Sequence, residues 1–190
     1  MTPILLAPPA LEPLTLDETR LWLRLDSSDE DQLVLALIRA ARSAVEQATR
    51  RALIAQPWRL RLDRWPVERS LRLPLSPIMR LDAVRVFDAA GAPTLADLAG
   101  FHIDQSRGAK LVCDVAPPAP GRIANGIEID VTAGFGAAPQ DVPEPLRMAM
   151  RLLVAHWYEH RGDALHEDRV AHLPPGVAAA VTPWRAARLA

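Results

Sequence analysis

The chain has 190 residues, of which 49% are hydrophobic, and a formal net charge of −1 at pH 7. This length and apolar content suffice for one folded domain with a buried core and argue against disorder throughout. The balanced charge argues against a dedicated nucleic-acid binder, which would carry a basic excess. Lys110 is the only lysine among 22 basic residues, so the positive charge is almost entirely arginine, a residue that favours bidentate contacts at protein interfaces.

Cysteine usage and the N-terminal sequence indicate where the protein works. Cys113 is the only cysteine, so no disulfide can form within the chain and a reducing compartment is the simplest interpretation. No basic residue precedes Arg20, and prolines interrupt this segment, which is not typical of a secretory signal. No apolar run approaches the roughly 20 residues that a membrane span needs. We therefore expect a soluble protein made in the cytoplasm, without membrane association.

The N-terminal region predicts an extended arm and then a helix. Residues 1–14 carry four prolines and few polar anchors, so we expect an arm that orders only against something else. Thr15 and Glu18 have the spacing of a capping box, which predicts a helix over 15–25. Leu16, Leu21 and Leu25 give that helix an apolar side.

A second helix is predicted over 29–51. Ser28 can cap it, and its acidic first turn suits the helix dipole. Arg42, Glu46 and Arg50 have the spacing of i,i+4 ion pairs on its polar side. The apolar side comprises Leu33, Leu37, Ile38, Ala41, Ala44, Val45 and Ala48.

The hydrophobic period changes from 3.6 to 2 after Ile54, which predicts a β region over 57–133. Five runs read as strands of a small antiparallel sheet or barrel: the segments that begin at Trp58, Leu71, Leu81, Lys110 and Gly126. In the last strand, Ile127, Ile129 and Val131 alternate with polar residues, so we expect one wet face. The arginines from Arg59 to Arg72 are interpreted as the solvated side of the sheet.

The strongest helix prediction covers 142–161. Pro143 and Pro145 are tolerated only in a first turn, so the helix begins between Asp141 and Glu144. Gly162 is the expected stop. One stripe comprises Leu146, Met150, Leu153 and Trp157, with Ala149 beside it, and Arg147, Arg151 and Tyr158 form a narrow opposite strip.

The same helix contains His156-Trp-Tyr-Glu159-His160, which matches the H-x-x-E-H pattern of inverted zinc proteases. Two histidines at i and i+4 can ligate one zinc ion, with the glutamate as general base. The helical angles work against this role, because Glu159 points away from the stripe that the histidines border. Glu167 and Asp168 are weak substitutes for a third ligand. The alternative interpretation is two histidines at the end of a buried helix, near the negative end of its dipole.

Residues 163–190 form a tail with a polar loop and then an apolar segment. One or two helical turns are expected around Val177 to Val181. Trp184, almost at the chain end, either folds back onto the core or anchors a partner, since Trp and Arg are common interface anchors. No other segment predicts catalysis or a cofactor, so we expect no enzyme. The predicted fold class is α+β: two N-terminal helices and a central helix near the C-terminus, interrupted by the antiparallel β region.

Taken in order along the chain, short motifs resemble one known family. They include Leu23-Arg-Leu-Asp26, Leu37-Ile-Arg-Ala-Ala-Arg42, Gln56-Pro-Trp58, Leu73-Pro-Leu-Ser-Pro77, Val131-Thr-Ala-Gly-Phe-Gly136 and Ala155-His-Trp-Tyr-Glu-His-Arg161. The chain resembles the head-tail connector (adaptor) proteins of long-tailed bacteriophages and of phage-derived gene transfer agents. His160 departs from the pattern, which favours a small polar residue there.

The resemblance implies a structural connector subunit of the particle neck, assembled in the host cytoplasm. It implies self-association into a ring, expected to contain twelve copies, that joins the portal protein to the next connector, stopper or tail component. Packaged DNA would pass through this ring without sequence-specific binding. The resemblance does not itself assign partner-binding residues, because the tail is variable. For a ring subunit we expect the tail residues Val177, Pro183, Trp184, Arg185 and Arg188 to dock on the portal, and Arg147 and Arg151 to face a neighbouring subunit. Two alternatives stay open from the sequence: a zinc-dependent hydrolase, and a cytoplasmic interaction domain outside any virion.

Overall fold

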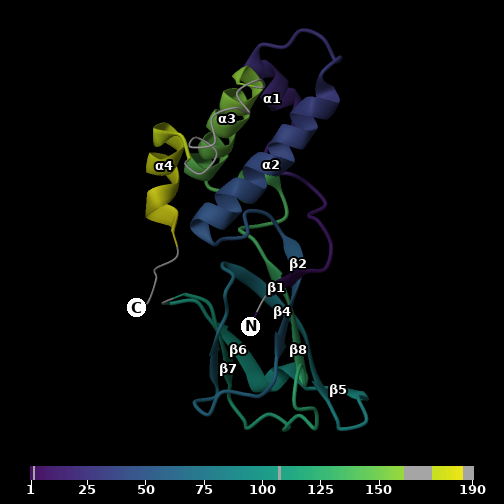
Figure 1. Ribbon diagram of the computed structural model, residues 1–190. Coiled ribbons are helices and arrows are strands. Elements are labelled where there is room, and N and C mark those ends of the chain that lie inside the picture. The colour runs from purple at the N-terminus through teal and green to yellow at the C-terminus, as the bar shows by residue number, and fades with distance from the viewer. Residues whose placement is uncertain (2, 107, 161–172, 186–190) are drawn as a thin grey trace. The chain divides into compact units, whose positions relative to one another are not determined.

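A computed structural model describes residues 1, 3–106, 108–160 and 173–185. The chain divides into two compact units, and it crosses between them three times. The β unit comprises residues 1–10 and 55–135, and the helical unit comprises residues 11–54 and 136–190. The prediction of an α+β fold with an antiparallel β region inserted between helices is confirmed (Figure 1).

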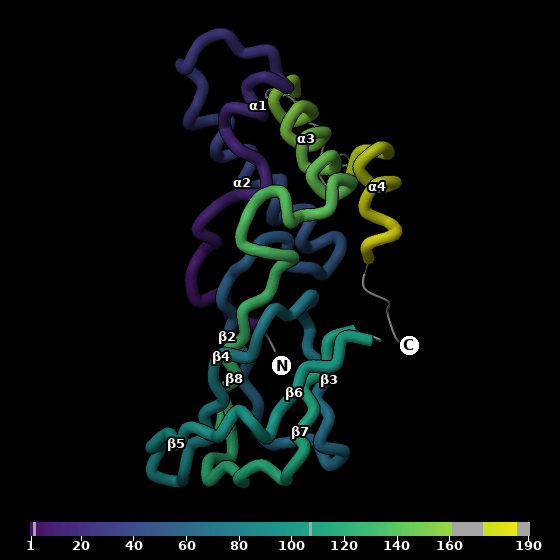
Figure 2. Tube along the Cα trace, turned by 180° about the vertical axis from the view of Figure 1, so that it is seen from behind, coloured from purple at the N-terminus to yellow at the C-terminus, as the bar shows by residue number. Residues whose placement is uncertain are grey.

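The β unit contains two antiparallel sheets (Figure 2). The first has the order β1 (Pro3–Leu5), β2 (Gln56–Leu62), β8 (Ile127–Ala133), β4 (Ile78–Phe87) and β5 (Pro93–Leu95). The second has the order β3 (Ser70–Arg72), β7 (Lys110–Cys113) and β6 (Phe101–Asp104), and a 3-10 turn, η1 (Leu98–Gly100), precedes β6. The sequence did not predict β1, β5 and β6. Strands β1 and β5 each span three residues and begin with a proline, which argues against a strand prediction.

Strand β8 lies at the centre of the first sheet. Ile129 pairs with Leu60 of β2 and with Val84 of β4, and all three side chains are buried on the apolar face. The prediction that the other face of β8 is wet is wrong. Glu128 and Asp130 are each only 8% exposed.

Arginines from the flanking strands cover these two carboxylates. Arg59 donates to both oxygens of Asp130, at 2.7 and 2.9 Å, and Arg85 donates to the same carboxylate at 2.6 Å. Arg61 donates to Glu128 at 3.0 Å. Burial alone would raise the pKa of Asp130, but the hydrogen bonds and charges of Arg59 and Arg85 outweigh it, so this pKa is lowered. The arginines of β2 and β4 are therefore engaged within the sheet.

The N-terminal arm lies against the chain's own sheet, which differs from the expectation that it orders only against something else. Strand β1 pairs antiparallel with β2, with Ile4 opposite Arg59 and Leu5 opposite Trp58. Leu6 extends the pairing through its N–H, which donates to the carbonyl of Pro57 at 3.0 Å. The arm is thus the edge strand of the first sheet.

The helical unit contains α1 (Leu16–Leu23), α2 (Asp31–Thr49), α3 (Glu144–Glu159) and α4 (Pro175–Val181), with 3-10 turns η2 (Pro139–Asp141) and η4 (Thr182–Trp184). Helix α3 begins where Pro143 and Pro145 predict, and the part of the chain around Gly162 lies outside the described residues. None of the helices in the described ranges has both the length and the apolar content that crossing a bilayer requires.

Helices α2 and α3 form the core of this unit, and α4 packs on α3. The predicted stripe on α3 is confirmed for Leu146, Met150 and Leu153, which are fully buried or nearly so, whereas Trp157 is half-buried. On α2 the buried stripe runs through Val34 instead of Leu33, and it continues through Ile38, Ala41, Val45 and Thr49. Small residues on both helices, Ala41 and Ala149, allow their backbones to approach closely.

The start of α2 also differs from its prediction. The N-cap residue is Glu30, without a side-chain cap, and Ser28 contributes its carbonyl, which accepts from the N–H of Asp31 at 3.2 Å. The Ser27 hydroxyl donates to the carboxylate of Asp29 at 3.1 Å. The serines therefore stabilise the turn before the helix rather than the helix itself.

Candidate partner-binding surfaces

Helix α1 begins at a side-chain cap and ends in a left-handed residue. The hydroxyl of Thr15 accepts from the N–H of Glu18 at 3.2 Å, as the capping-box spacing predicts. The helix ends at Leu23, because Arg24 has a φ of 57°. A non-glycine residue in this region costs about 1 kcal/mol, which the backbone hydrogen bonds of the turn offset. This turn fixes the position of Arg24 beside the helix end.

Glu18 does not complete the capping box with its side chain. Its carboxylate accepts from Arg147 Nη2 at 2.9 and 3.0 Å and lies 3.5 Å from Arg151 Nη2. Glu144 holds the same two guanidinium groups from the first turn of α3. The hydrogen bond from Arg151 is the main reason why the pKa of Glu144 is lowered. Two carboxylates and two arginines therefore form one ionic cluster that joins α1 to α3.

This cluster determines what Arg147 and Arg151 can contact. Their side chains are only 15% and 14% exposed, and the Nε of Arg147 also donates to the carbonyl of Pro13 at 3.1 Å. Within the chain, both arginines hold α1 and the segment before it against α3. Their predicted contact with a neighbouring subunit stays a prediction, and little of either side chain is left for it.

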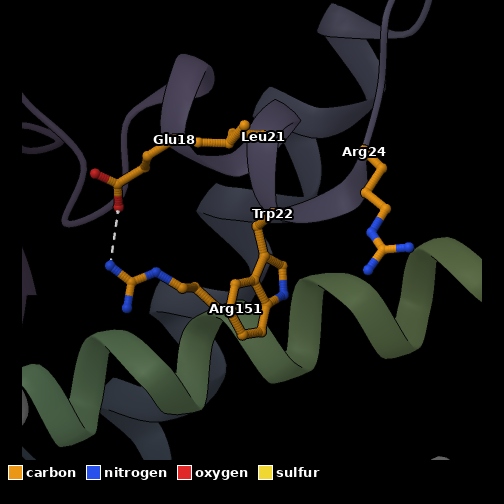
Figure 3. Close-up of a pocket in the computed structure, with 5 residues that line it drawn as sticks. All are labelled: Glu18, Leu21, Trp22, Arg24 and Arg151. Atoms are coloured by element: carbon orange, nitrogen blue, oxygen red, sulfur yellow. Dashed lines mark hydrogen bonds and ion pairs between the residues drawn. The ribbon is translucent and has the colours of Figure 1, made fainter.

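Helix α1 buries only Thr19 and turns large apolar side chains outward. Leu21 is 81% exposed and Trp22 is 43% exposed, so the apolar side predicted for this helix is not covered at Leu21 within the chain. In Figure 3, Trp22 projects from α1 over α3, with Arg151 on one side and Arg24 on the other. These residues line an open pocket together with Glu18. We call Glu18, Leu21, Trp22, Arg24 and Arg151 the α1 patch.

The α1 patch has the chemistry of a protein interface. Trp and Arg are the residues that most often dominate binding energy at interfaces. Exposed apolar residues bordered by charges mark interaction sites in soluble proteins. Within the part of the chain that the structure describes, Arg24 forms no ion pair, so its charge is available to a partner. Sequence reasoning missed this site because the spacing of Leu16, Leu21 and Leu25 marks an apolar side of the helix without showing whether that side is covered.

The C-terminal residues assigned to docking lie in different surroundings. Val177 on α4 is fully buried, so it packs within the helical unit and offers no surface. Pro183 and Arg185 are exposed, and Trp184 is half-buried. The carbonyl of Trp184 accepts from Arg51 Nε at 2.7 Å, which fixes the end of the described tail to the residues after α2. Arg188 lies outside the described residues.

The two histidines of the H-x-x-E-H pattern do not form a metal centre in this structure. His156 and His160 lie side by side, with ring centroids 4.5 Å apart, and both are exposed, as is Glu159. His160 Nδ1 lies 2.8 Å from the carbonyl of His156. This contact at the end of α3 occupies one ring nitrogen of His160. Among the described residues, no group of three His, Cys, Asp or Glu side chains is placed to hold a metal ion. The zinc-hydrolase alternative therefore has no support.

The exposed apolar residues of the α1 patch, bordered by charges, mark a candidate surface for a protein partner. Comparison with known proteins gives the family of the chain. The sequence model of the phage gp6-like head-tail connector protein family matches residues 13–79. Comparison with curated proteins finds no match.

Solved structures extend this likeness over the whole chain. A chain in the structure "Neck of empty GTA particle computed with C6 symmetry", where GTA denotes a gene transfer agent, is 32% identical, with a TM-score of 0.84. A chain in "Virion of native gene transfer agent (GTA) particle" is 33% identical, with a TM-score of 0.80. A chain in "Neck of native GTA particle computed with C12 symmetry" is 33% identical, with a TM-score of 0.77. Each match covers 100% of this chain and 98% of the other.

The chain therefore belongs to the family of phage gp6-like head-tail connector proteins. It is a structural connector subunit of a phage or gene transfer agent particle, as the motifs along the sequence predict. Neither the zinc hydrolase nor the cytoplasmic interaction domain is supported.

Proposed function

We propose that the chain assembles as a ring of twelve copies in the particle neck, between the portal protein and the next connector, stopper or tail component. The observation that carries this proposal is the likeness, over the full chain, to chains from particle necks computed with sixfold and twelvefold symmetry. A closed ring requires a heterologous contact, in which two different surfaces of the subunit meet. Each subunit must then present at least one surface that the single chain leaves uncovered.

The α1 patch is the best candidate for one of these two surfaces. Leu21 and Trp22 supply the apolar centre, and Arg24 supplies a cation for an acidic group on the neighbour. Arg151 lies at the border of the patch and Arg147 lies behind it, so we assign Arg151 to the edge of the subunit contact. Arg147 acts as a positioning residue, because it holds Glu18 and therefore α1 in place.

The C-terminal segment is proposed to dock on the portal. Pro183, Trp184 and Arg185 follow α4 directly, and the chain continues to Arg188 beyond them. Val177 supports this segment indirectly, since its burial holds α4 on α3. The hydrogen bond from Arg51 to the Trp184 carbonyl fixes the start of the docking segment at a defined position.

The charge of the chain suits a conduit for DNA. The formal net charge of −1, and the pairing of Arg59, Arg61 and Arg85 with carboxylates of β8, leave little basic surface on this face of the sheet. A strongly basic lumen would retain DNA by releasing its counterions. We therefore propose passage of DNA without sequence-specific binding, and a structural role without catalysis or a cofactor.

The test is assembly of the purified chain with its portal, because a free subunit can need the portal to close its ring. The double variant Leu21→Ser, Trp22→Ala should fold normally, as judged by circular dichroism and urea unfolding, but should fail to assemble in size-exclusion chromatography. Leu95→Ser is the matched control, because Leu95 is also exposed, on edge strand β5. Normal assembly of the double variant would exclude the α1 patch from the subunit contact, whereas a wild-type chain that never joins the portal would contradict the ring.

A further inference from the structure

Strand β1 forms a short pairing with its own sheet. Among the described residues it pairs with β2 over Pro3–Leu5, and the pairing ends with the hydrogen bond from the N–H of Leu6 to the carbonyl of Pro57. Ile4, Leu5 and Leu6 all stay exposed in the single chain. A three-residue strand with exposed side chains buries too little apolar surface to resist local opening.

The segment after β1 is suited to act as a hinge. Residues 7–11 contain Pro8 and Pro9, and they form no hydrogen bond with any other described residue. Residues 7–11 belong to no helix or strand, and the backbone bends at Ala7, Ala10 and Leu11, so this linker lacks the regular hydrogen bonds that would resist a change of conformation. The linker of residues 7–11 also joins the β unit to the helical unit.

The residues that follow the linker are anchored in the helical unit independently of β1. Leu14 is buried in the helical unit, and Glu12 accepts from Arg42 Nε at 2.7 Å. The carbonyl of Pro13 accepts from Arg147. The arm can therefore leave its own β2 without disturbing the point at which the chain enters the helical unit.

The edge that β1 forms lacks the usual protection against pairing with other chains. Edge strands normally carry charged residues that oppose such pairing, and Ile4, Leu5 and Leu6 supply none.

We propose that neighbouring subunits of the ring exchange their N-terminal arms, so that residues 1–10 of each copy pair with β2 of the next copy. This inference rests on the proposed ring. Exchange keeps every β1–β2 contact of the single chain, so no strand pairing is lost. It also links each subunit to its neighbour through residues 7–11. We assign the β2 edge to a second copy of the chain, because residues 3–5 already pair with β2 in a defined register, with Ile4 opposite Arg59.

A disulfide placed across this register distinguishes the two pairings. In the variant Ile4→Cys, Arg59→Cys, the two cysteines lie directly opposite on neighbouring antiparallel strands, within the distance that a disulfide requires. Arg85 still holds Asp130 in this variant. The matched control is Ile4→Cys alone, since Cys113 is buried in β7 and provides no partner. Rings are assembled with the portal under reducing conditions, then oxidised, and the chains are separated on a denaturing gel.

Exchange predicts covalent multimers that extend up to twelve chains from the oxidised ring, and an intrachain bond alone from the oxidised free subunit. Oxidation before assembly should then block ring formation, and a reductant should restore it. Rings that form normally and yield only intrachain disulfides overturn the exchange and leave the ring proposal intact. If the reduced chain joins no ring at all, both proposals fail.

Discussion

Glu18 on α1 accepts two hydrogen bonds from Arg147 on α3, across 129 positions of sequence, at 2.9 and 3.0 Å. Because α1 buries only Thr19, the ion pairs of Glu18 with Arg147 and Arg151 contribute to holding α1 on α3. The position of the α1 patch, and so of the proposed subunit contact, depends on an ion pair within the chain.

Replacing Glu18 with glutamine should therefore loosen α1 without unfolding the helical core. The pair is half-buried, so we expect a loss of about 1 kcal/mol in the free energy of unfolding, measured with urea. Asp17→Asn is the control, because Asp17 is exposed on the same helix. Assembly with the portal should weaken for Glu18→Gln and not for Asp17→Asn. Equal behaviour of the two variants would mean that packing alone positions α1.

Acidification should destabilise the β unit through Asp130. Because the pKa of Asp130 is lowered in the folded chain, its carboxylate binds a proton less readily there than in the unfolded chain. The resulting stabilisation is complete above the unfolded value of about 3.9 and is lost as pH falls through the lower folded value. Asp130→Asn should cost about 2 kcal/mol at pH 7, because Arg59 and Arg85 lose a charged acceptor.

The same variant should also show a smaller loss of stability between pH 7 and pH 3 than the wild-type chain, measured by urea unfolding at both values. Glu68→Gln, at an exposed position of the β unit, should change neither quantity. An unchanged pH dependence in Asp130→Asn would assign acid sensitivity to other carboxylates.

Variants at Val177 and Arg185 should distinguish a loss of folding stability from a loss of portal binding. Val177→Ala opens a cavity between α4 and α3 and should reduce the free energy of unfolding by about 1–3 kcal/mol. Arg185→Glu lies on an exposed residue and should leave the unfolding curve unchanged while weakening binding to the portal. Ala179→Ser, at an exposed position of α4, serves as the neutral control. Portal binding that tolerates Arg185→Glu would argue against docking by this segment.

Removing both histidines should leave the connector intact. The variant His156→Gln, His160→Gln should assemble as the wild type does, and zinc should not raise the melting temperature of either protein. A zinc-dependent rise in the wild type that disappears in the variant would restore the metal hypothesis.

Helix α3 could be predicted from the sequence because its determinants are local. Pro143 and Pro145 restrict its start, and the spacing of Leu146, Met150 and Leu153 marks its buried face. Local spacing also predicted the cap of α1 at Thr15.

Features that depend on distant partners could not be predicted in this way. Periodicity marked Leu21 as apolar but could not tell whether its side of α1 is covered. The alternation in β8 identified Glu128 and Asp130 as one face, yet their burial depends on arginines that strand register brings from β2 and β4. Strand β1 exists only because β2 pairs with it, so a run of three residues gave no signal of its own.

The account stands on the claim that this chain is a ring subunit that joins the portal. Native mass spectrometry of the purified chain mixed with its portal tests this most directly, because it counts the copies in the complex. We predict a complex that contains twelve copies of the chain, the symmetry with which one similar neck structure was computed. A portal that retains no copies of the chain, or binds isolated monomers without closing a ring, would contradict the account.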